Sequence, residues 1–382
     1  MDAMHQPFRE HHLFQLLFEY EQQTAPLDLF ISLYFRSHKA LGSKDRGFIA
    51  EAVYALVRWK GMLDYFCQPE EPTWARRIQI LQEIDLENLQ EEETIPLHTR
   101  LSFPKPLFEL ILESHGVENG SEICLASNYP APTTVRANLL KTTREELLHR
   151  WKDLYPVYPC KFSETGITFG KKLNFFELPE FKAGLFEVQD EGSQLLASLV
   201  TIEPGQIFLD YCAGSGGKTL AIAPQMQGKG QIYLHDIRPH ALLEAKKRLK
   251  RAGVQNGQLI NWDEEKKLKN LKKKCDWVLV DAPCTGTGTL RRNPDMKWKF
   301  SVEAYERLLG QQRMIFEKAL SFLKPGGSIV YATCSVLSGE NQRQVEHFLK
   351  TYPLELVKAP LITLPSQGGM DGFFGAVFKL SK

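Results

Sequence analysis

The sequence predicts an α/β protein built on a mostly parallel sheet, preceded by a small α/β module and an N-terminal helical domain. Short apolar strands alternate with helical stretches through the second half of the 382-residue chain, a pattern typical of βαβ units. A glycine-rich turn follows the first of those strands, and open α/β sheets bind ligands there. Apolar residues at one-face helical spacing predict the N-terminal helices.

Residues 1–120 are predicted to form the helical domain. In "SKDRGFIAEAVYALVRWKGMLDYF", which begins at Ser43, apolar side chains recur on one helical face. Ser43 is the predicted N-cap, since a serine hydroxyl can accept a hydrogen bond from a free amide of the first turn. No pattern in this domain indicates chemistry.

Residues 121–185 are predicted to form a small α/β module that binds RNA. "PTTVRANLL" and "GITFG" are typical of strands, and Thr143 with Glu146 forms a capping box for a short helix between them. Basic and aromatic side chains of this module either face nucleic acid or, for the aromatic ones, pack in its core. They are Arg136, Arg150, Trp151 and Lys161.

Residues 186–382 are predicted to form the large α/β domain. Its expected strands are "QIFLD", "QIYLHD", "GQLIN", "DWVLVD" and "SIVYAT". The expected helices are 218–227, 240–252 and 302–323. Because binding sites of such domains lie at the carboxyl ends of the strands, the loops there should hold the chemistry.

Composition narrows the class of protein. A net charge of +1 with 43% hydrophobic and 24% charged residues is ordinary for a soluble globular chain. The seven cysteines are odd in number and scattered without C-x-x-C spacing, so neither a disulfide framework nor a metal site is expected. The absence of a signal-like start and of a long apolar run predicts a cytoplasmic protein without membrane contact.

The glycine loop "FLDYCAGSGGKT" admits three ligand classes: a nucleoside triphosphate, a dinucleotide and S-adenosylmethionine. A triphosphate loop requires glycine at position 212, which is Cys212. A dinucleotide fingerprint requires a third glycine near Thr219. Gly214 and Gly216 still allow close backbone approach to a ligand, and Asp236 ends the next strand, where a carboxylate can bind a ribose.

Two cysteines follow strands of the same predicted sheet. Cys284 lies in "VDAPCTGTG" and Cys334 in "YATCSVLSGEN". A single cysteine is most often a small buried apolar residue. Two cysteines at equivalent strand ends, beside a nucleoside-binding loop, favour a catalytic pair.

These motifs resemble the RNA 5-methylcytosine methyltransferase family, which includes the bacterial 16S rRNA enzyme RsmB and the eukaryotic NSUN proteins. The similar segments are "FEVQDEGSQLLASLV", "CAGSGGKT", "DAPCTGTGTLRRNPDMKW", "YATCSVLSGEN" and "DGFFGAVFKL". The resemblance spans residues 133–382 and implies a Rossmann-like class I S-adenosylmethionine methyltransferase domain. Residues 1–120 resemble, more weakly, the NusB-like domain of the RsmB type. Among the family members named above, the RsmB type is the most similar to this chain in domain organisation.

The resemblance implies methyl transfer to C5 of cytosine in RNA. Cys334 is then the nucleophile that adds to C6, because a covalent adduct divides one difficult step into easier ones. Cys284 assists product release, with removal of the C5 proton as a candidate role. Asp281 is expected to bond the cytosine edge. Lys218 is either the cation that favours the thiolate or a solvent-facing helix-start lysine.

The resemblance also implies the residues that bind the cofactor, S-adenosylmethionine. They are Cys212, Ala213, Gly214, Ser215, Gly216, Gly217, Lys218, Asp236, Asp263 and Asp281. Two features depart from the family pattern: Gly214 and Ser215 replace Ala-Pro, and the Gly-Asp expected at Asp263 reads "NWDEE".

The reacting base must leave its stack, so single-stranded or opened RNA is the expected substrate. Arg291, Arg292 and Lys297 either hold phosphates or have solvated or structural roles, and Trp298 either stacks on a base or packs. Ribosomal RNA is the favoured target, transfer RNA the alternative, and a noncatalytic assembly factor the alternative of another class. An amino-group methyltransferase is disfavoured by "DAPC". Nothing in the sequence fixes the oligomeric state, and a monomer is compatible with it.

Overall fold

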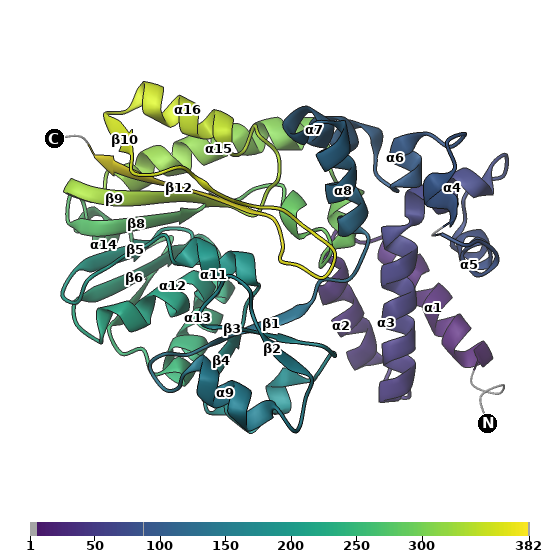
Figure 1. The fold of residues 1–382 in the computed structure, drawn as a ribbon, viewed down its shortest axis with the longest axis horizontal. Coiled ribbons are helices and arrows are strands. Elements are labelled where there is room, and N and C mark those ends of the chain that lie inside the picture. Colours follow the sequence, from purple (N-terminus) through teal and green to yellow (C-terminus); the bar gives the residue numbers. More distant parts are fainter. Residues whose placement is uncertain (1–5, 87, 381–382) are drawn as a thin grey trace. The chain divides into compact units, whose positions relative to one another are not determined.

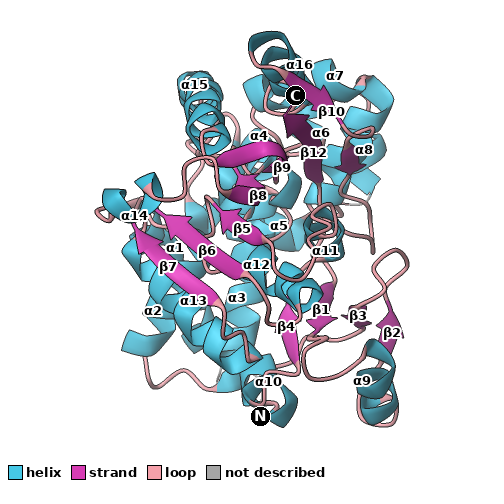
Figure 2. Ribbon diagram, turned by 90° about the vertical axis from the view of Figure 1, so that its left-hand side faces the viewer, coloured by secondary structure: helices cyan, strands magenta, loops and turns pink. Residues whose placement is uncertain are grey.

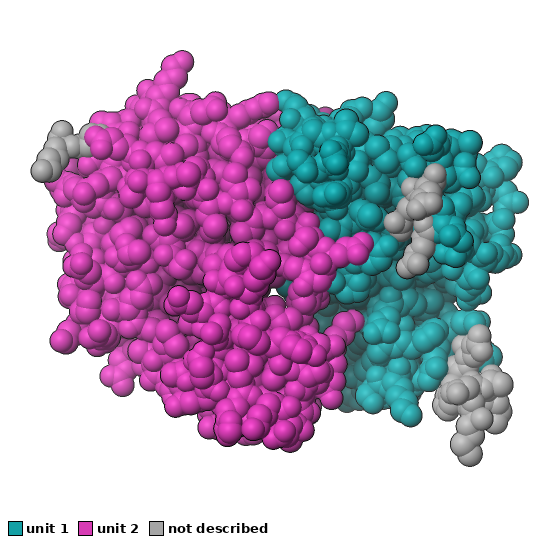
Figure 3. Space-filling view, in the orientation of Figure 1, with its two compact units in different colours: residues 1–130, 289–302 teal, residues 131–288, 303–382 magenta. Residues whose placement is uncertain are grey.

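The computed structural model describes residues 6–86 and 88–380. The chain divides into two compact units (Figure 3), one made of residues 1–130 and 289–302, the other of residues 131–288 and 303–382. The first unit therefore takes its residues from two stretches of chain that are far apart in the sequence.

The first unit is helical, as predicted. Its α-helices are α1 (Gln6–Glu21), α2 (Leu27–Ser37), α3 (Ser43–Arg58), α4 (Lys60–Cys67), α5 (Trp74–Glu83), α6 (Leu97–Arg100), α7 (Lys105–His115) and α8 (Val117–Ser127), with a 3₁₀ turn η1 (Asn88–Glu91). The apolar faces of α1 to α5 meet in one core around Leu16, Ile49 and Val53, none of which is exposed to solvent.

The expected N-cap of α3 is wrong by one residue. Ser43 is the first helical residue, and Gly42 is the N-cap. The Asp45 carboxylate accepts a hydrogen bond from the Gly42 amide at 3.3 Å. The carboxylate two residues after Ser43 thus caps the helix start, and the Ser43 hydroxyl is not needed for it.

Residues 289–302 complete the core of the helical unit. The Asp295 carboxylate accepts a hydrogen bond from the Tyr20 hydroxyl at 2.9 Å. The Lys297 amine donates to the Arg58 carbonyl at 2.7 Å and to Asn128 Oδ1 at 2.6 Å. The Trp298 indole donates to the Val57 carbonyl at 2.6 Å. This segment is anchored by buried polar contacts.

These contacts decide between the alternatives that the sequence left open for three residues. Arg291 and Lys297 are each 1% exposed, so neither side chain is available to an RNA phosphate. Trp298 packs against the helical core, which selects the packing alternative over base stacking. Arg292 is half-buried, and its contact with phosphate stays a prediction.

The second unit contains a large sheet whose strand order is β7-β6-β5-β8-β9-β12-β10, with β11 paired to β12 (Figure 2). The strands are β5 (Ile207–Asp210), β6 (Gln231–Asp236), β7 (Gly257–Asn261), β8 (Cys275–Asp281), β9 (Leu323–Thr333), β10 (Leu354–Leu356), β11 (Leu361–Thr363) and β12 (Phe373–Leu380). Strands β5 to β9 pair in parallel, which confirms the five predicted strands. Strand β12 pairs antiparallel with β9.

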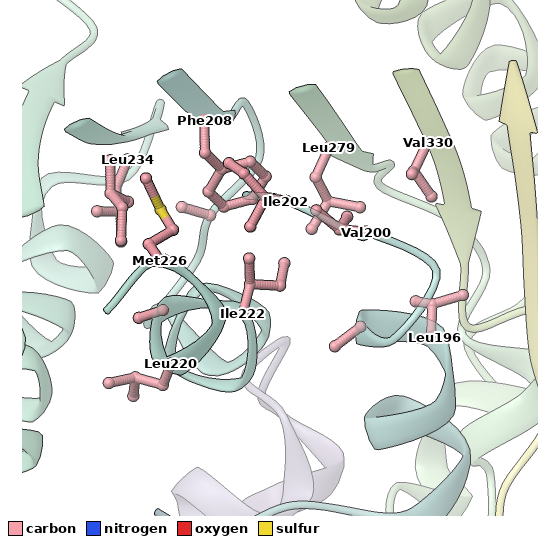
Figure 4. Close-up of a cluster of buried hydrophobic side chains, with 14 of the residues drawn as sticks. Leu196, Val200, Ile202, Phe208, Leu220, Ile222, Met226, Leu234, Leu279 and Val330 are labelled. Atoms are coloured by element: carbon pink, nitrogen blue, oxygen red, sulfur yellow. The ribbon is translucent and has the colours of Figure 1, made fainter. Parts of the chain in front are cut away.

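Helices cover both faces of this sheet (Figure 1). On one face lie α11 (Glu191–Ala197), α12 (Gly217–Ile222), which continues into η3 (Ala223–Met226), and α13 (Pro239–Ala252). On the other face lie α15 (Val302–Leu320) and α16 (Gln342–Thr351), with α14 (Glu265–Lys269) near the β7 edge. Figure 4 shows Leu220 and Ile222 of α12 beside Phe208 and Leu234 of the strands.

A second, four-stranded antiparallel sheet has the order β2-β3-β1-β4. Its strands are β1 (Thr133–Ala137), β2 (Val157–Pro159), β3 (Gly166–Phe169) and β4 (Phe186–Val188), and its helices are α9 (Arg144–Trp151), η2 (Phe175–Glu177) and α10 (Pro179–Lys182). The predicted capping box of Thr143 and Glu146 is confirmed.

Two of the four side chains that were candidates for nucleic-acid contact are buried in this module. Trp151 is fully buried in its core, and Arg136 is 4% exposed and donates to Gln189 Oε1 at 2.7 Å. Arg150 and Lys161 are exposed, so a contact with RNA remains possible for these two only.

Candidate active site

The predicted site residues start from one edge of the large sheet. Asp210, Asp236 and Asp281 end β5, β6 and β8. In the strand register, Asp281 pairs with Ala332, and Asp236 pairs with Asn261. Because parallel strands end at a common edge, the loops that carry Cys212, Cys284 and Cys334 all begin there.

The glycine loop runs along this edge between β5 and α12. Gly214 and Gly216 have φ of +53° and +77°, a region that residues with a Cβ rarely adopt. The Gly214 amide donates to Asp236 Oδ2 at 2.8 Å, which ties the loop to the end of β6. Cys212, Ala213, Ser215 and Gly217 lie in the same turn, and burial raises the pKa of the Cys212 thiol.

An arginine of α13 holds the position where this loop departs from the family pattern. Arg248 Nη1 donates to the Ser215 carbonyl at 3.0 Å and to its hydroxyl at 2.7 Å. The same guanidinium donates to Glu187 Oε2 of β4 at 3.0 and 3.1 Å. The glycine loop is therefore connected through Arg248 to the small antiparallel sheet.

The end of β6 carries a buried carboxylate and an exposed apolar side chain. Asp236 is 4% exposed and accepts from the Arg238 backbone and guanidinium at 2.9–3.0 Å. Although burial opposes it, these hydrogen bonds and the one from Gly214 lower the pKa of Asp236. Ile237, the next residue, is 69% exposed.

The neighbouring strand β7 leads to Asp263, which is exposed, and to Trp262, which is 60% exposed. Sequence reasoning singled out Asp263 but neither Ile237 nor Trp262. Ile237 and Trp262 are large apolar residues that directly follow the ends of two neighbouring strands. This position in the sequence marks them as candidates, since a planar ligand can pack between such side chains.

Asp210 is a buried acid that sequence reasoning did not assign to the site. It is 1% exposed and accepts from the Thr219 hydroxyl at 2.6 Å. Burial raises its pKa to about 7. Its other oxygen, Oδ1, has no hydrogen-bond partner among the described residues.

The two cysteines predicted to act together are in contact. Cys284 Sγ and Cys334 Sγ are 3.3 Å apart. Their loops are joined by the Gly288 amide, which donates to the Cys334 carbonyl at 2.9 Å, and by Thr287 Oγ1, which is 3.0 Å from Ser335 Oγ. A Cβ on Gly288 would lie 2.1 Å from the Gly372 carbonyl oxygen, so the loop that carries Cys284 tolerates only glycine at this position.

The pKa of Cys284 is well above its usual range. The largest cause is the hydrogen bond with Cys334, followed by burial. Either sulfur can be the donor in the hydrogen bond that joins them.

Lys218 points into the site and does not face solvent. Its ammonium forms a salt bridge with the Asp281 carboxylate, and the two side chains are 12% and 31% exposed. Burial alone would lower the pKa of Lys218, but Asp281 and, to a smaller extent, Cys334 raise it. Lys218 thus stays charged next to both groups, and the solvent-facing alternative is wrong.

Two features are absent from residues 6–86 and 88–380. No group of three or more histidine, cysteine or acidic side chains there has the arrangement of a metal site. No helix of this part of the chain is long and apolar enough to cross a membrane.

Comparison with known proteins identifies the family. Residues 197–379 match the family described as "16S rRNA methyltransferase RsmB/F", and residues 103–175 match its ferredoxin-like domain. A probable ribosomal RNA small subunit methyltransferase B from Synechocystis sp. is 30% identical over 311 residues, covering 76% of this chain and 70% of the relative. The chain belongs to the RsmB/F methyltransferase family. Membership makes it an S-adenosylmethionine-dependent RNA methyltransferase, as the motifs predicted.

Two further relatives extend this assignment of the RsmB/F protein. The crystal structure of a methyltransferase homolog protein from Pyrococcus horikoshii matches with a TM-score of 0.64 at 28% identity, covering 74% of this chain and 97% of that chain. The 25S rRNA (cytosine-C(5))-methyltransferase nop2 of Schizosaccharomyces pombe is 29% identical over 276 residues, covering 70% of this chain and 44% of the relative.

Proposed function

We propose that this RsmB/F protein methylates C5 of a cytosine in ribosomal RNA through a covalent adduct between Cys334 and C6 of the base. The observation that carries the proposal is the contact of the two cysteine sulfurs at 3.3 Å, beside the Lys218–Asp281 ion pair. The name of the nop2 relative supports C5 of cytosine as the target atom. The name of the Synechocystis relative supports ribosomal RNA over transfer RNA.

The first chemical step requires a thiolate at Cys334, because the thiol is a poor nucleophile. Two groups favour that charge. The Cys284 sulfur lies 3.3 Å from the Cys334 sulfur, where its thiol can donate a hydrogen bond to a Cys334 thiolate. The buried Lys218 ammonium interacts electrostatically with Cys334 and stays charged. A thiolate flanked by a donor and a cation is ready to attack C6.

The later steps assign a second role to Cys284. Addition of Cys334 to C6 places an electron pair on C5, and bound S-adenosylmethionine supplies the electrophilic methyl group that C5 accepts. Once the Cys334 sulfur is bonded to carbon, the largest cause of the raised Cys284 pKa is weakened, so Cys284 gives up its proton more easily than in the free enzyme, although burial still opposes this. The Cys284 thiolate then takes the C5 proton, the S–C6 bond breaks, and the C5–C6 double bond is restored.

The residues at the sheet edge fit a nucleoside-bearing cofactor. Gly214 and Gly216 leave the loop open to close approach, and Asp236 ends β6 at the place where a carboxylate binds ribose hydroxyls. Ile237 and Trp262 offer exposed apolar surfaces for the adenine ring, with Asp263 beside them. Asp281 orients the cytosine edge. Through its ion pair, it also orients the Lys218 side chain.

Methyl transfer to RNA is the direct test. The protein is incubated with methyl-labelled S-adenosylmethionine and either total RNA or small-subunit assembly intermediates, and labelled nucleosides are separated and mapped. We expect 5-methylcytosine in ribosomal RNA, and at least about a hundredfold loss of rate in Cys334→Ala, since the nucleophile is absent. Cys160→Ala, a buried cysteine of the small module, is the control. Label in transfer RNA, or unchanged activity of Cys334→Ala, would contradict the proposal.

The role of Cys284 has a separate readout. Cys284→Ala is expected to accumulate RNA covalently bound to protein, visible as a shifted band on a denaturing gel, because the adduct forms but resolves slowly. The double variant Cys284→Ala/Cys334→Ala should give no such band. Normal turnover without adduct in Cys284→Ala would remove Cys284 from the release step.

A further inference from the structure

A buried carboxylate lies behind the cysteine pair, and the mechanism does not use it. Glu340 is fully buried. Burial raises its pKa, and the hydrogen bonds that oppose this rise come from Ser335, Thr285 and Gln312. Burying a carboxylate among neutral donors costs free energy. A buried carboxylate such as Glu340 is therefore a stronger indication of a specific role than an exposed acid.

The donors to Glu340 are the residues that follow the two cysteines. The Thr285 amide donates to Oε1 at 2.9 Å, and the Thr285 hydroxyl donates to Oε2 at 2.6 Å. On the other loop, the Ser335 hydroxyl donates to the same carboxylate. One side chain thus joins the backbone next to Cys284 to the residue next to Cys334.

Gln312 of α15 extends this connection to the residue before Cys284. Its Nε2 donates to Glu340 Oε1 at 3.0 Å and to the Pro283 carbonyl at 3.1 Å. The Tyr331 hydroxyl donates to the Glu340 carbonyl at 2.7 Å and to Gln312 Oε1 at 3.1 Å. Residues on both sides of Cys284 are therefore held by groups that bond Glu340.

The two cysteine loops depend on Glu340 to different extents. The turn after Cys334 has anchors of its own, because Asn341 bonds Thr333 Oγ1 at 2.6 Å and donates to the Ser335 carbonyl at 2.9 Å. At the residues adjoining Cys284, the Thr285 amide and the Pro283 carbonyl are bonded by Glu340 and Gln312, and the shortest bond of the Thr285 hydroxyl also goes to Glu340. Loss of the carboxylate should displace Cys284 more than Cys334.

We propose that Glu340 is a positioning residue, which holds Cys284 against Cys334 and so within reach of the base that Cys334 binds. This role rests on the proposed function, because it concerns the release step of the same reaction. The carboxylate also adds to the raised pKa of Cys284, which keeps the proton on that sulfur before attack.

The test compares Glu340→Ala with the wild-type protein in the methylation assay and on a denaturing gel with RNA. We expect Glu340→Ala to behave like Cys284→Ala: covalent RNA adduct rises about tenfold or more and kcat falls in proportion, while KM for RNA changes by less than about threefold. Glu346→Ala is the matched control, because it removes an exposed acid from helix α16, which begins just after Glu340. Glu340→Gln keeps one oxygen acceptor and should restore most of the turnover.

A second variant tests the role of Glu340 in case Glu340→Ala does not fold. Thr285→Val preserves the shape of the side chain and removes its hydroxyl, which bonds Glu340 at 2.6 Å and lies farther, at 3.2 Å, from Thr287 Oγ1. It should therefore raise the adduct level in the same direction by a smaller factor. A folded Glu340→Ala with wild-type turnover and no adduct would overturn the role of Glu340. So would equal loss of adduct formation and turnover, because that result indicates damage to Cys334 as well. If Cys284→Ala itself forms no adduct, the proposed function fails first, and the two failures are thereby distinguished.

Discussion

Asp210, Asp236 and Asp281 end three neighbouring strands, yet each has a different environment. Asp236 is hydrogen-bonded to Arg238 and the Gly214 amide, which lower its pKa, although burial opposes this. Asp281 pairs with Lys218. Asp210 has only the Thr219 hydroxyl on one oxygen, and burial raises its pKa to about 7. The charge of Asp210 is thus the least favourable of the three.

This difference predicts how stability depends on pH. The folded state holds the Asp210 proton up to pH of about 7, whereas the unfolded chain releases it near pH 3.8, so the folded state binds more protons between these values. Stability from this group therefore falls as pH rises through that window, by about 1.4 kcal/mol per pKa unit. Asp210→Asn removes the cost, and its gain in free energy of unfolding over wild type should be larger at pH 8 than at pH 5.

Urea unfolding of the cofactor-free protein at the two pH values measures this gain. The exposed Asp153→Asn serves as the control, and it should show no pH-dependent difference from wild type. An equal effect of Asp210→Asn at both pH values would show that the carboxyl does not titrate in this window.

At the residue scale, sequence reasoning succeeded where position along a strand decides the outcome. Cys284 and Cys334 were predicted to share one edge of the sheet, and their sulfurs are in contact. It failed for Arg291 and Lys297, because a basic residue after an active-site loop indicates RNA contact only when the side chain is exposed. The Lys297 amine bonds the Arg58 carbonyl and Asn128 Oδ1, both more than 150 positions earlier in the chain, and no local pattern reveals such contacts.

Among the elements, α13 has a role that its sequence conceals. Arg248 lies in a run of basic residues, yet it binds Ser215 of the glycine loop and Glu187 of β4. Ser215 occupies a position where many family members have proline, so the bond to its hydroxyl depends on this chain's departure from the pattern. Through Arg248, helix α13 thereby stabilises the shape of the glycine loop.

Removal of the guanidinium should weaken cofactor binding. Arg248→Ala loses two hydrogen bonds to the loop, and we expect the Kd for S-adenosylmethionine to rise about five- to thirtyfold, corresponding to about 1–2 kcal/mol. Titration calorimetry measures the change, with Lys247→Ala, whose side chain is 75% exposed, as the control on the same helix. An unchanged Kd in Arg248→Ala would mean that the loop keeps its shape without this support.

The predicted elements and the observed ones differ mainly at the end of the chain. The parallel strands β5 to β9 were predicted because each is short, apolar and followed by a loop and a helix. Strand β12 has eight residues and pairs antiparallel with β9, and it was identified only as part of a motif. Its continuous apolar run carries no periodicity that distinguishes a strand from a buried helix, and the three-residue β10 and β11 are too short for any pattern.

For the molecule as a whole, the sequence predicted a helical part followed by α/β parts, but it did not predict that the helical unit includes residues 289–302. Asp295, Lys297 and Trp298 bond Tyr20, Arg58 and Val57 across more than 230 positions of chain. Contacts of this range leave no trace in hydrophobic spacing, which reports only neighbours along one element.

This arrangement predicts that one cut cannot separate the fragments. A protease recognition sequence inserted between Pro130 and Ala131 should allow complete cleavage, yet the two fragments should elute together in gel filtration, because the first still holds residues 289–302 of the second. Lys297→Ala, which leaves the Asn128 and Arg58 oxygens without this donor, should promote their separation. Lys152→Ala, an exposed lysine, should not. Separation of the cleaved protein without any substitution would refute the prediction.

The same anchoring has a consequence for synthesis. A ribosome delivers the N-terminal helices first, and domains generally fold as they emerge. Here α1 and α3 must leave space for Asp295 and Trp298 until most of the chain has been translated, and contacts of such sequence separation form late. Helices α1 and α3 are therefore translated long before the residues that complete their core, and until then apolar side chains of that core stay partly uncovered.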